Sequence, residues 1–149
     1  MNSISYSVNQ LNSKPVWDEY VYIIGYCFLI SPRKSMYKDG VKHRLSATLV
    51  ISDEEHFDPT VLSSRIDLKS KVFSSFLLVQ PWSNYILEDL LKKNHLEKCK
   101  VRILACLHKR ILVEVRQILK AELLDENNNV IDTAKVAESE MPVKFRGSI

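Results

Sequence analysis

The segment KVRILACLHKRILVEVRQILKAEL, residues 100–123, constrains the fold more than any other part of the chain. Apolar residues take alternate positions on both sides of three polar residues, His108, Lys109 and Arg110. Alternation with a period of two is typical of a strand that buries one face. The segment therefore predicts two long antiparallel strands joined by a short cationic turn.

Three more strands and one helix are predicted upstream of this ribbon. β-Branched and aromatic residues, or alternating apolar residues, favour strands at residues 20–30, 44–51 and 72–79. Residues 83–94 repeat apolar side chains at helical spacing instead. Gly25 in the middle of the first strand indicates a bulge, a bend or a close backbone approach. Such a strand is more typical of a barrel than of a flat sheet.

The predicted order is β-β-β-α-β-β, a mainly β chain with one inserted helix. Five strands with a helix between the third and fourth are the order of an oligonucleotide/oligosaccharide-binding (OB) barrel. We therefore predict a five-stranded OB-fold barrel over residues 20–124, with a small α+β sandwich as the alternative. Residues 1–19 are expected to form an N-terminal arm or a short capping element. Residues 125–149 form a polar C-terminal tail, in which a short helix can form around residues 133–139.

Composition agrees with one globular domain. The chain has 149 residues, of which 46% are hydrophobic and 26% charged. Its net charge of +3 is compatible with a polyanionic partner but does not identify one. Three cysteines without CxxC spacing favour structural thiols in a reducing compartment. The N-terminus lacks the organisation of a secretory signal, and the longest apolar run is too short to span a bilayer. We expect a soluble intracellular protein without a membrane partner.

Two cationic loops are the predicted nucleic-acid-binding site. An OB barrel binds ligands across its second and third strands, between the loops that join strands one to two and four to five. Cationic loops attract a phosphate backbone through counterion release. The predicted residues are Arg33, Lys34, Tyr37, Lys38, Lys42, Arg44, His108, Lys109 and Arg110. Tyr37 is the preferred stacking residue, because it lies among Lys and Gly in a loop. The alternative is that these loops are basic only because they are solvated.

Other aromatic residues are weaker stacking candidates. Tyr20, Tyr22, Tyr26 and Phe28 alternate along the first strand, and Phe73 and Phe76 lie in the third. Packing is the favoured interpretation for the tyrosine stripe, since alternate positions of a barrel strand face the core or pack under a helix.

Two tryptophans and the helix are candidates for protein contacts. Trp17 and Trp82 lie outside the strongly periodic segments, where an exposed tryptophan often anchors an interface. Ile86 and Leu90 belong to a narrow apolar stripe of the helix. That stripe has a second, preferred interpretation, in which the helix plugs the bottom of the barrel.

No enzymatic chemistry is predicted. The four histidines are scattered, and no metal-binding, nucleotide-binding or nucleophile motif occurs. Only DEEHFD at residues 53–58 gathers carboxylates around a histidine, and the alternative is a small enzyme or metal protein that binds a cation there. Acidic turns of this kind are, however, common at strand ends. We predict no catalytic residue, cofactor or metal site.

The segments YIIGYCFLIS, HRLSATLVISDEE and CKVRILACLHKRILVEVRQILKAELL resemble the single-strand-binding OB domains of the replication protein A family. They are similar in particular to its small and middle subunits and to their telomeric counterparts in the CST capping complex. Gly25, the turn at Ser52 and Asp53, and the Val101, Ile103, Ala105 run carry the resemblance, which covers about residues 20–124. It implies a nuclear, chromosomal subunit of a single-stranded DNA complex, acting at telomeres or in DNA replication.

The predicted function is therefore non-enzymatic binding of single-stranded DNA, or of RNA, by one subunit of a larger complex. The alternative is an OB-fold scaffold that acts only through protein–protein contacts.

Overall fold

The computed structural model describes residues 4–31, 34–45, 47–58, 76–79, 85–109 and 113–149. Its helices and strands are β1 (Ser5–Tyr6), α1 (Val8–Ser13), β2 (Val21–Ser31), β3 (Lys34–Lys38), β4 (Val41–Leu45), β5 (Thr48–Ser52), β6 (Phe76–Val79), α2 (Tyr85–Lys93), β7 (Lys98–Lys109), β8 (Val113–Leu124) and β9 (Val130–Lys135). Two short 3-10 helices follow, at Glu138–Glu140 and Val143–Phe145. The mainly β architecture predicted from the sequence is confirmed.

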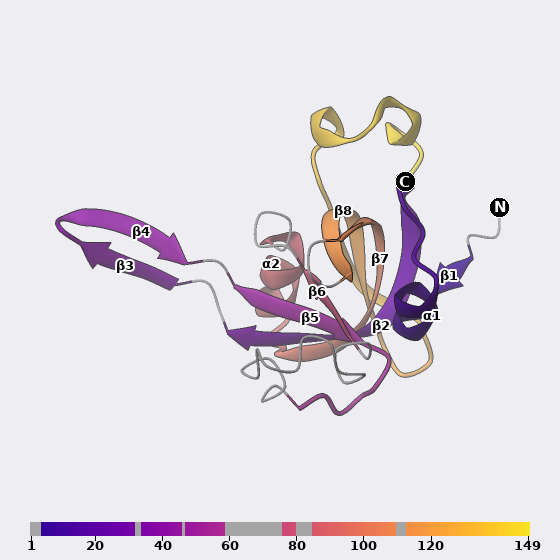
Figure 1. The fold of residues 1–149 in the computed structure, drawn as a ribbon, viewed down its shortest axis with the longest axis horizontal. Helices are drawn as coiled ribbons and strands as arrows, with labels where there is room; N and C mark the ends of the chain where they lie inside the picture. The colour runs from indigo at the N-terminus through magenta and orange to yellow at the C-terminus, as the bar shows by residue number, and fades with distance from the viewer. Residues whose placement is uncertain (1–3, 32–33, 46, 59–75, 80–84, 110–112) are drawn as a thin grey trace.

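The strands of the main sheet close into a ring (Figure 1). Strand β2 pairs with β5, β5 with β6, β6 with β8 and β8 with β7, and β7 pairs back onto β2. The β6–β8 pair is parallel, and the other pairs of the ring are antiparallel. The long β7–β8 ribbon that the alternating pattern predicted is confirmed. Apolar side chains from every strand of the ring are buried inside it, including Ile23, Leu49, Leu77, Ile103 and Leu119.

Gly25 lies where two strands of the ring approach closely. A Cβ atom at this position would be 2.8 Å from the carbonyl oxygen of Ser52 and 2.9 Å from Cγ2 of Ile51. Both distances are shorter than real Cβ contacts allow, so a side chain would force the strands apart. The sequence predicted a bulge, a bend or a close backbone approach at this glycine, and the structure shows the close approach.

Helix α1 packs against the ring near this point. Val8 and Leu11 are fully buried in the main core, and Cγ2 of Val8 lies near Gly25. Ser7 and Gln10 form a capping box at the start of the helix. Strand β1 adds a short parallel pairing to β2, at Ser5 and Tyr6. The described part of residues 1–19 therefore acts as a capping element of the ring.

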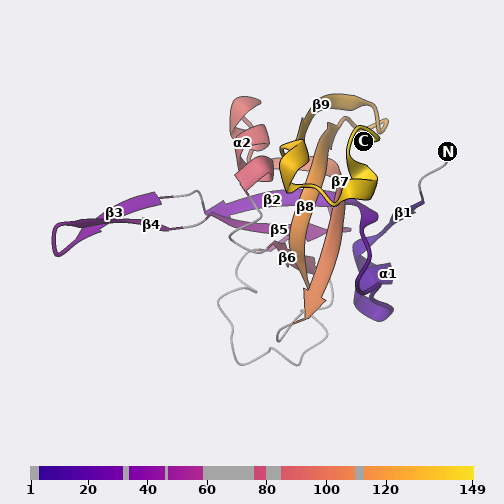
Figure 2. The ribbon, with the colours of Figure 1, turned by 90° about the horizontal axis from the view of Figure 1, so that it is seen from above.

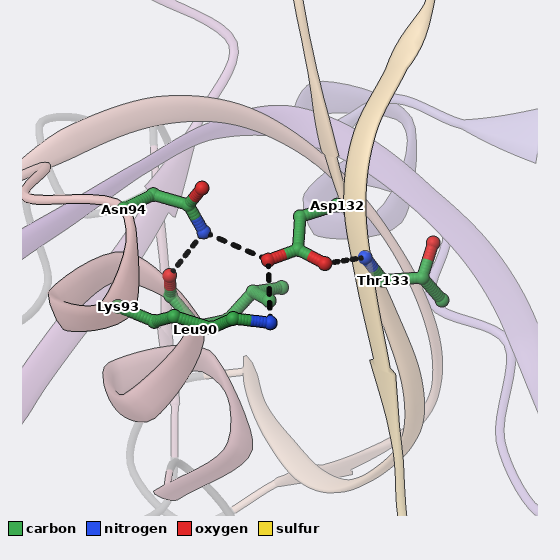
Figure 3. Close-up of polar contacts among 5 residues, drawn as sticks. All are labelled: Leu90, Lys93, Asn94, Asp132 and Thr133. Atoms are coloured by element: carbon green, nitrogen blue, oxygen red, sulfur yellow. Dashed lines mark hydrogen bonds and ion pairs between the residues drawn. The ribbon is translucent and has the colours of Figure 1, made fainter.

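Strand β9 continues the sheet beyond β8 and contacts helix α2 (Figure 3). The carboxylate of Asp132 accepts a hydrogen bond from the Asn94 side chain at 3.0 Å. The Lys93 ammonium lies 3.2 Å from the same oxygen. Asn94 also donates to the carbonyl oxygen of Leu90 at 2.8 Å. These contacts join the end of α2 to β9.

The prediction of a short helix around residues 133–139 is wrong for residues 133–135. Residues 133–135 are paired in β9 with Glu122, Ala121 and Lys120 of β8. The edge of β8 supplies hydrogen-bond partners that an isolated segment lacks, and this outweighs local helix preference. Helical structure in this region is limited to the 3-10 turn at Glu138–Glu140.

Strands β3 and β4 form a hairpin of their own that projects from the ring in both views (Figures 1 and 2). Asp39 and Gly40 make its turn, with φ angles of 54° and 77°. Two consecutive positive φ angles are what a two-residue type I′ turn requires, and Asp-Gly favours it. The segment expected to be a loop at residues 31–42 is thus largely strand. The second strand predicted at residues 44–51 is divided between β4 and β5.

Candidate nucleic-acid interface

The β3–β4 hairpin carries three exposed residues of the predicted binding site. Tyr37 is 73% exposed, and Lys38 and Lys42 are also exposed. Tyr37 lies directly opposite Lys42 in the strand register, whereas Lys38 lies opposite Val41. Directly opposed residues of an antiparallel pair share one face of the sheet. One face of the hairpin thus presents an aromatic ring beside an ammonium group, and the other presents Lys38 beside Val41.

The same hairpin contains two further predicted residues. The backbone of Lys34 begins β3, opposite Leu45, and Arg44 lies opposite Ser35. Arg33 lies outside the described residues. Of the predicted residues in this region, the structure therefore brings the five that it describes onto one projecting hairpin rather than spreading them along an irregular loop.

The tip of the β7–β8 ribbon is a separate site. Lys109 is exposed and lies opposite Val113, while His108 lies opposite the carboxylate-bearing Glu114. Arg110 lies outside the described residues. In Figure 2 the ribbon and the β3–β4 hairpin leave the ring in different directions. The predicted residues His108 and Lys109 are therefore not gathered with those of the hairpin, and Glu114 lowers the local positive charge.

An aromatic cluster lies on the outer face of β2, β5 and β6. Phe28, Val50 and Phe76 alternate with core residues of these strands and form a second apolar cluster. Phe57, which follows β5, has its ring centroid 5.6 Å from that of Phe28 and 5.2 Å from that of Phe76. Phe28 is only 9% exposed and Phe76 only 2%. In this structure the rings of Phe28 and Phe76 pack within the cluster and are not open to a ligand.

Phe57 is the member of this cluster that sequence reasoning missed. It is half-buried and lies across the sheet face. The sequence offers only a weak signal for it, because a single aromatic residue in a loop is common and its partners Phe28 and Phe76 are far from it in the chain. Phe73, another candidate from the third strand, lies outside the described residues.

An open groove lined by both apolar and charged residues starts beside this aromatic cluster. A cavity of about 270 Å³ is lined by Phe28, Ile30, Phe57 and Lys98, among others. A second cavity, of about 430 Å³, shares Leu29, Ile30 and Glu97 with it and extends to the residues after α2. The Lys98 ammonium donates to the carbonyl oxygen of Glu55 at 3.1 Å. The groove follows the end of β2, where the chain leaves the ring for the hairpin.

The tyrosines of β2 and just before it are engaged in packing. The Tyr20 hydroxyl donates to the Gln117 side chain at 2.7 Å, and its ring packs edge-on against Phe145. Burial, with Cys106 nearby, raises the pKa of Tyr20 to about 12. The Arg102 guanidinium lies 5.3 Å from the ring centroid of Tyr22 and also binds Glu122 at 2.8 Å. The Lys100 ammonium lies 6.0 Å from the ring of Tyr26. These contacts agree with packing as the favoured interpretation.

The predicted protein-contact residues divide into two groups. Ile86 and Leu90 are buried in the main core, so they are not available to a partner. This agrees with the preferred interpretation from the sequence, in which the apolar stripe of the helix packs against the barrel. Trp17 is 41% exposed and follows Pro15 and Val16, which line a mostly apolar cavity. Trp82 lies outside the described residues.

The acidic segment after β5 is used for internal contacts. Asp53 binds the start of α1, and Glu55 contacts Lys98. Within the described ranges, no group of three or more His, Cys, Asp or Glu residues is arranged to hold a metal ion. Nor is any helix of the described chain long and apolar enough to cross a membrane.

Comparison of the chain with protein-family models, with curated proteins and with solved structures found no match to any of them.

Proposed function

We propose that the chain is a non-enzymatic OB-fold subunit that binds single-stranded nucleic acid. The order of elements along the chain supports the fold. If the β3–β4 hairpin is treated as an excursion, the ring strands in chain order are β2, β5, β6, β7 and β8, with α2 between the third and fourth. That is the element order of an OB barrel. The hairpin then occupies the connection between the first two strands, which flanks the ligand face in such barrels.

The pairing of Tyr37 with Lys42 carries the functional proposal. Binding of a single strand combines aromatic faces, on which bases stack, with cations that neutralise phosphates. Tyr37 and Lys42 offer one of each on the same face of an exposed hairpin. An isolated two-stranded hairpin is marginally stable in water. A ligand that packs on Tyr37 would therefore also stabilise the hairpin.

The groove beside the aromatic cluster extends the proposed path of the strand. From the hairpin, a bound strand would follow Ile30 toward Phe57, with Lys98 at the rim. Phe57 is the ring that could move to admit a base, because it belongs to the segment after β5 rather than to a strand. The sequence resemblance adds the proposed setting, a nuclear complex at telomeres or in DNA replication, with DNA as the ligand.

A protein scaffold is the second candidate. The exposed Trp17, which follows two lining residues of the mostly apolar cavity at Tyr6, Pro15 and Val16, favours it. On this proposal the partner would cover the face formed by α1 and the residues after it, and the hairpin would not contact nucleic acid.

Fluorescence anisotropy of a labelled single-stranded oligonucleotide, titrated with the chain at low and high salt, tests the proposal. We expect binding that weakens steeply with salt. The double variant K38E/K42E should bind much more weakly than wild type. The matched control K14E/K144E, which changes two exposed lysines elsewhere, should bind almost as well.

Absence of binding by the wild type at low salt would favour the scaffold. An equal loss in both double variants would mean that net charge, and not the hairpin, determines the affinity.

A further inference from the structure

Two of the three cysteines are direct partners across the seam where the ring closes. Cys27 of β2 lies opposite Cys99 of β7 in the strand register, whereas Cys106 lies opposite Gln117 of β8. Directly opposed residues in an antiparallel pair have Cα atoms about 4.5–5.5 Å apart. Disulfides join Cα atoms about 4.4–6.8 Å apart, so this pairing falls within their range.

Both thiols also lie on the same side of the sheet. Cys27 is fully buried and belongs to the inward-facing set of β2, together with Ile23. Ile23 lies opposite Ile103, which is buried as well. Cys99 lies four residues before Ile103 on β7 and therefore faces the same side of the sheet. Burial raises the pKa of the Cys27 thiol, and the nearby Cys99 raises it further. The placement of the two thiols itself rests on the strand register, in which Cys27 lies directly opposite Cys99.

The two thiols differ in their access to solvent. Cys99 is half-buried and lines an open cavity of about 650 Å³, together with Tyr26, Lys98, Lys100 and others. Its sulfur lies 3.6 Å from the carbonyl oxygen of Leu124. Cys99 is therefore the more accessible of the two thiols, whereas Cys27 is covered by the core.

We propose that Cys27 and Cys99 are a redox modification site, at which a disulfide oxidant such as oxidised glutathione forms a reversible cross-strand disulfide. The Cys99 thiolate attacks one sulfur of the oxidant, forms a mixed disulfide and releases one glutathione thiolate. The Cys27 thiolate then attacks the Cys99 sulfur and releases the second. The cysteines lose two electrons and two protons, and one oxidised glutathione becomes two reduced molecules.

The reaction should be slow at neutral pH and faster as the pH rises. Only thiolates attack disulfides, and burial raises the pKa of Cys99 as it does that of Cys27. In a reducing compartment the pair stays reduced, so oxidation reports a shift toward oxidising conditions. The bond would fix β2 to β7 at the position next to Phe28 and Lys98.

Mass spectrometry of the folded full chain tests the site. The Cys106→Ser variant is incubated with oxidised glutathione over a range of alkaline pH, and remaining thiols are then alkylated. We expect the loss of two hydrogen masses, a cross-linked peptide pair that contains Cys27 and Cys99, and full reversal by a dithiol reductant. Two alkylated thiols, or a glutathione adduct that persists on Cys99, would overturn the proposal.

A second pair of variants checks the order of attack. In C27S/C106S glutathione should stay attached to Cys99, since no resolving thiol is present. In C99S/C106S the buried Cys27 should remain unmodified while the chain is folded. An adduct on Cys27 in this second variant would contradict the assigned roles. Because C99S/C106S leaves the buried Cys27 intact, the test does not depend on the stability of a core substitution.

Discussion

The Asp53 carboxylate caps a helix that begins 45 residues earlier in the chain, at Val8. One carboxylate oxygen accepts a hydrogen bond from the backbone amide of Val8 at 2.7 Å, and the other accepts one from Asn9 at 2.8 Å. The first amides of a helix have no partner within the helix, and a negative charge there is favourable. Asp53 therefore ties α1 to the end of β5.

The substitution Asp53→Ala should lower the free energy of unfolding by about 1–2 kcal/mol, the cost of losing a helix cap. Urea unfolding followed by circular dichroism measures it. Glu54→Ala, at the exposed neighbouring position, is the matched control and should change stability little. Equal effects of the two substitutions would mean that the Asp53 bonds do not stabilise the fold.

The substitution Gly25→Ala should lower the free energy of unfolding by about 1–3 kcal/mol, as overpacking of a core does. Its methyl group would meet the Ser52 carbonyl oxygen and the Ile51 side chain. Gly40→Ala offers a contrast. Apart from its chain neighbours, no atom of the described residues lies within 4 Å of its Cβ position, but its φ is +77°. We expect that variant to strain the hairpin turn and leave unfolding of the ring almost unchanged. A stable Gly25→Ala protein would contradict the close approach of the strands.

The fold was accessible from the sequence wherever one face of an element is buried. Alternation along residues 100–123 predicted β7 and β8 because their inner residues, such as Ile103 and Leu119, form the core. The β3–β4 hairpin was expected to be a loop, since no buried face imposes a clear pattern on an element that projects from the ring. Strand β9 was missed for a related reason. Its partners are an edge of β8 and the end of α2, and local sequence does not record either of them.

The candidate site was predictable in its residue types but not in their arrangement. Charge and aromatic content pointed to Tyr37, Lys38 and Lys42, yet their division between two faces follows only from the register. The ribbon tip was grouped with them because the loops of an expected fold were assumed to converge. Phe57 was overlooked because its role depends on contacts with Phe28 and Phe76, which are far from it in the sequence.

The bonds of Asp132 predict a pH dependence of stability. The Asn94 side chain, the Thr133 amide and Lys93 hold the pKa of this carboxyl below its usual value. A lowered pKa in the folded state contributes stability that is present above the unfolded pKa of about 4 and is lost as the pH falls through the folded value. Asp132→Asn should therefore be less stable than wild type at neutral pH, and the gap should close in acid.

Urea unfolding at a series of pH values from neutral to strongly acidic measures this gap. Glu126→Gln removes an exposed carboxylate outside the network and is the control. A difference between wild type and Asp132→Asn that stays constant with pH would show that the charge of Asp132 does not stabilise the contact between α2 and β9.

The last prediction separates stacking from charge at the β3–β4 hairpin. Tyr37→Ala removes the ring that lies opposite Lys42 and should weaken binding of a single-stranded oligonucleotide about 5- to 150-fold, since stacking of one base contributes about 1–3 kcal/mol. Tyr37→Phe keeps the ring and should bind nearly as wild type does. Val41→Thr alters an exposed side chain on the opposite face and serves as the control for hairpin integrity. Because none of the three substitutions changes the charge, the salt dependence of binding should stay the same in all of them. Unchanged affinity of Tyr37→Ala, in a protein that still binds in a salt-dependent manner, would mean that the hairpin contributes only its cations.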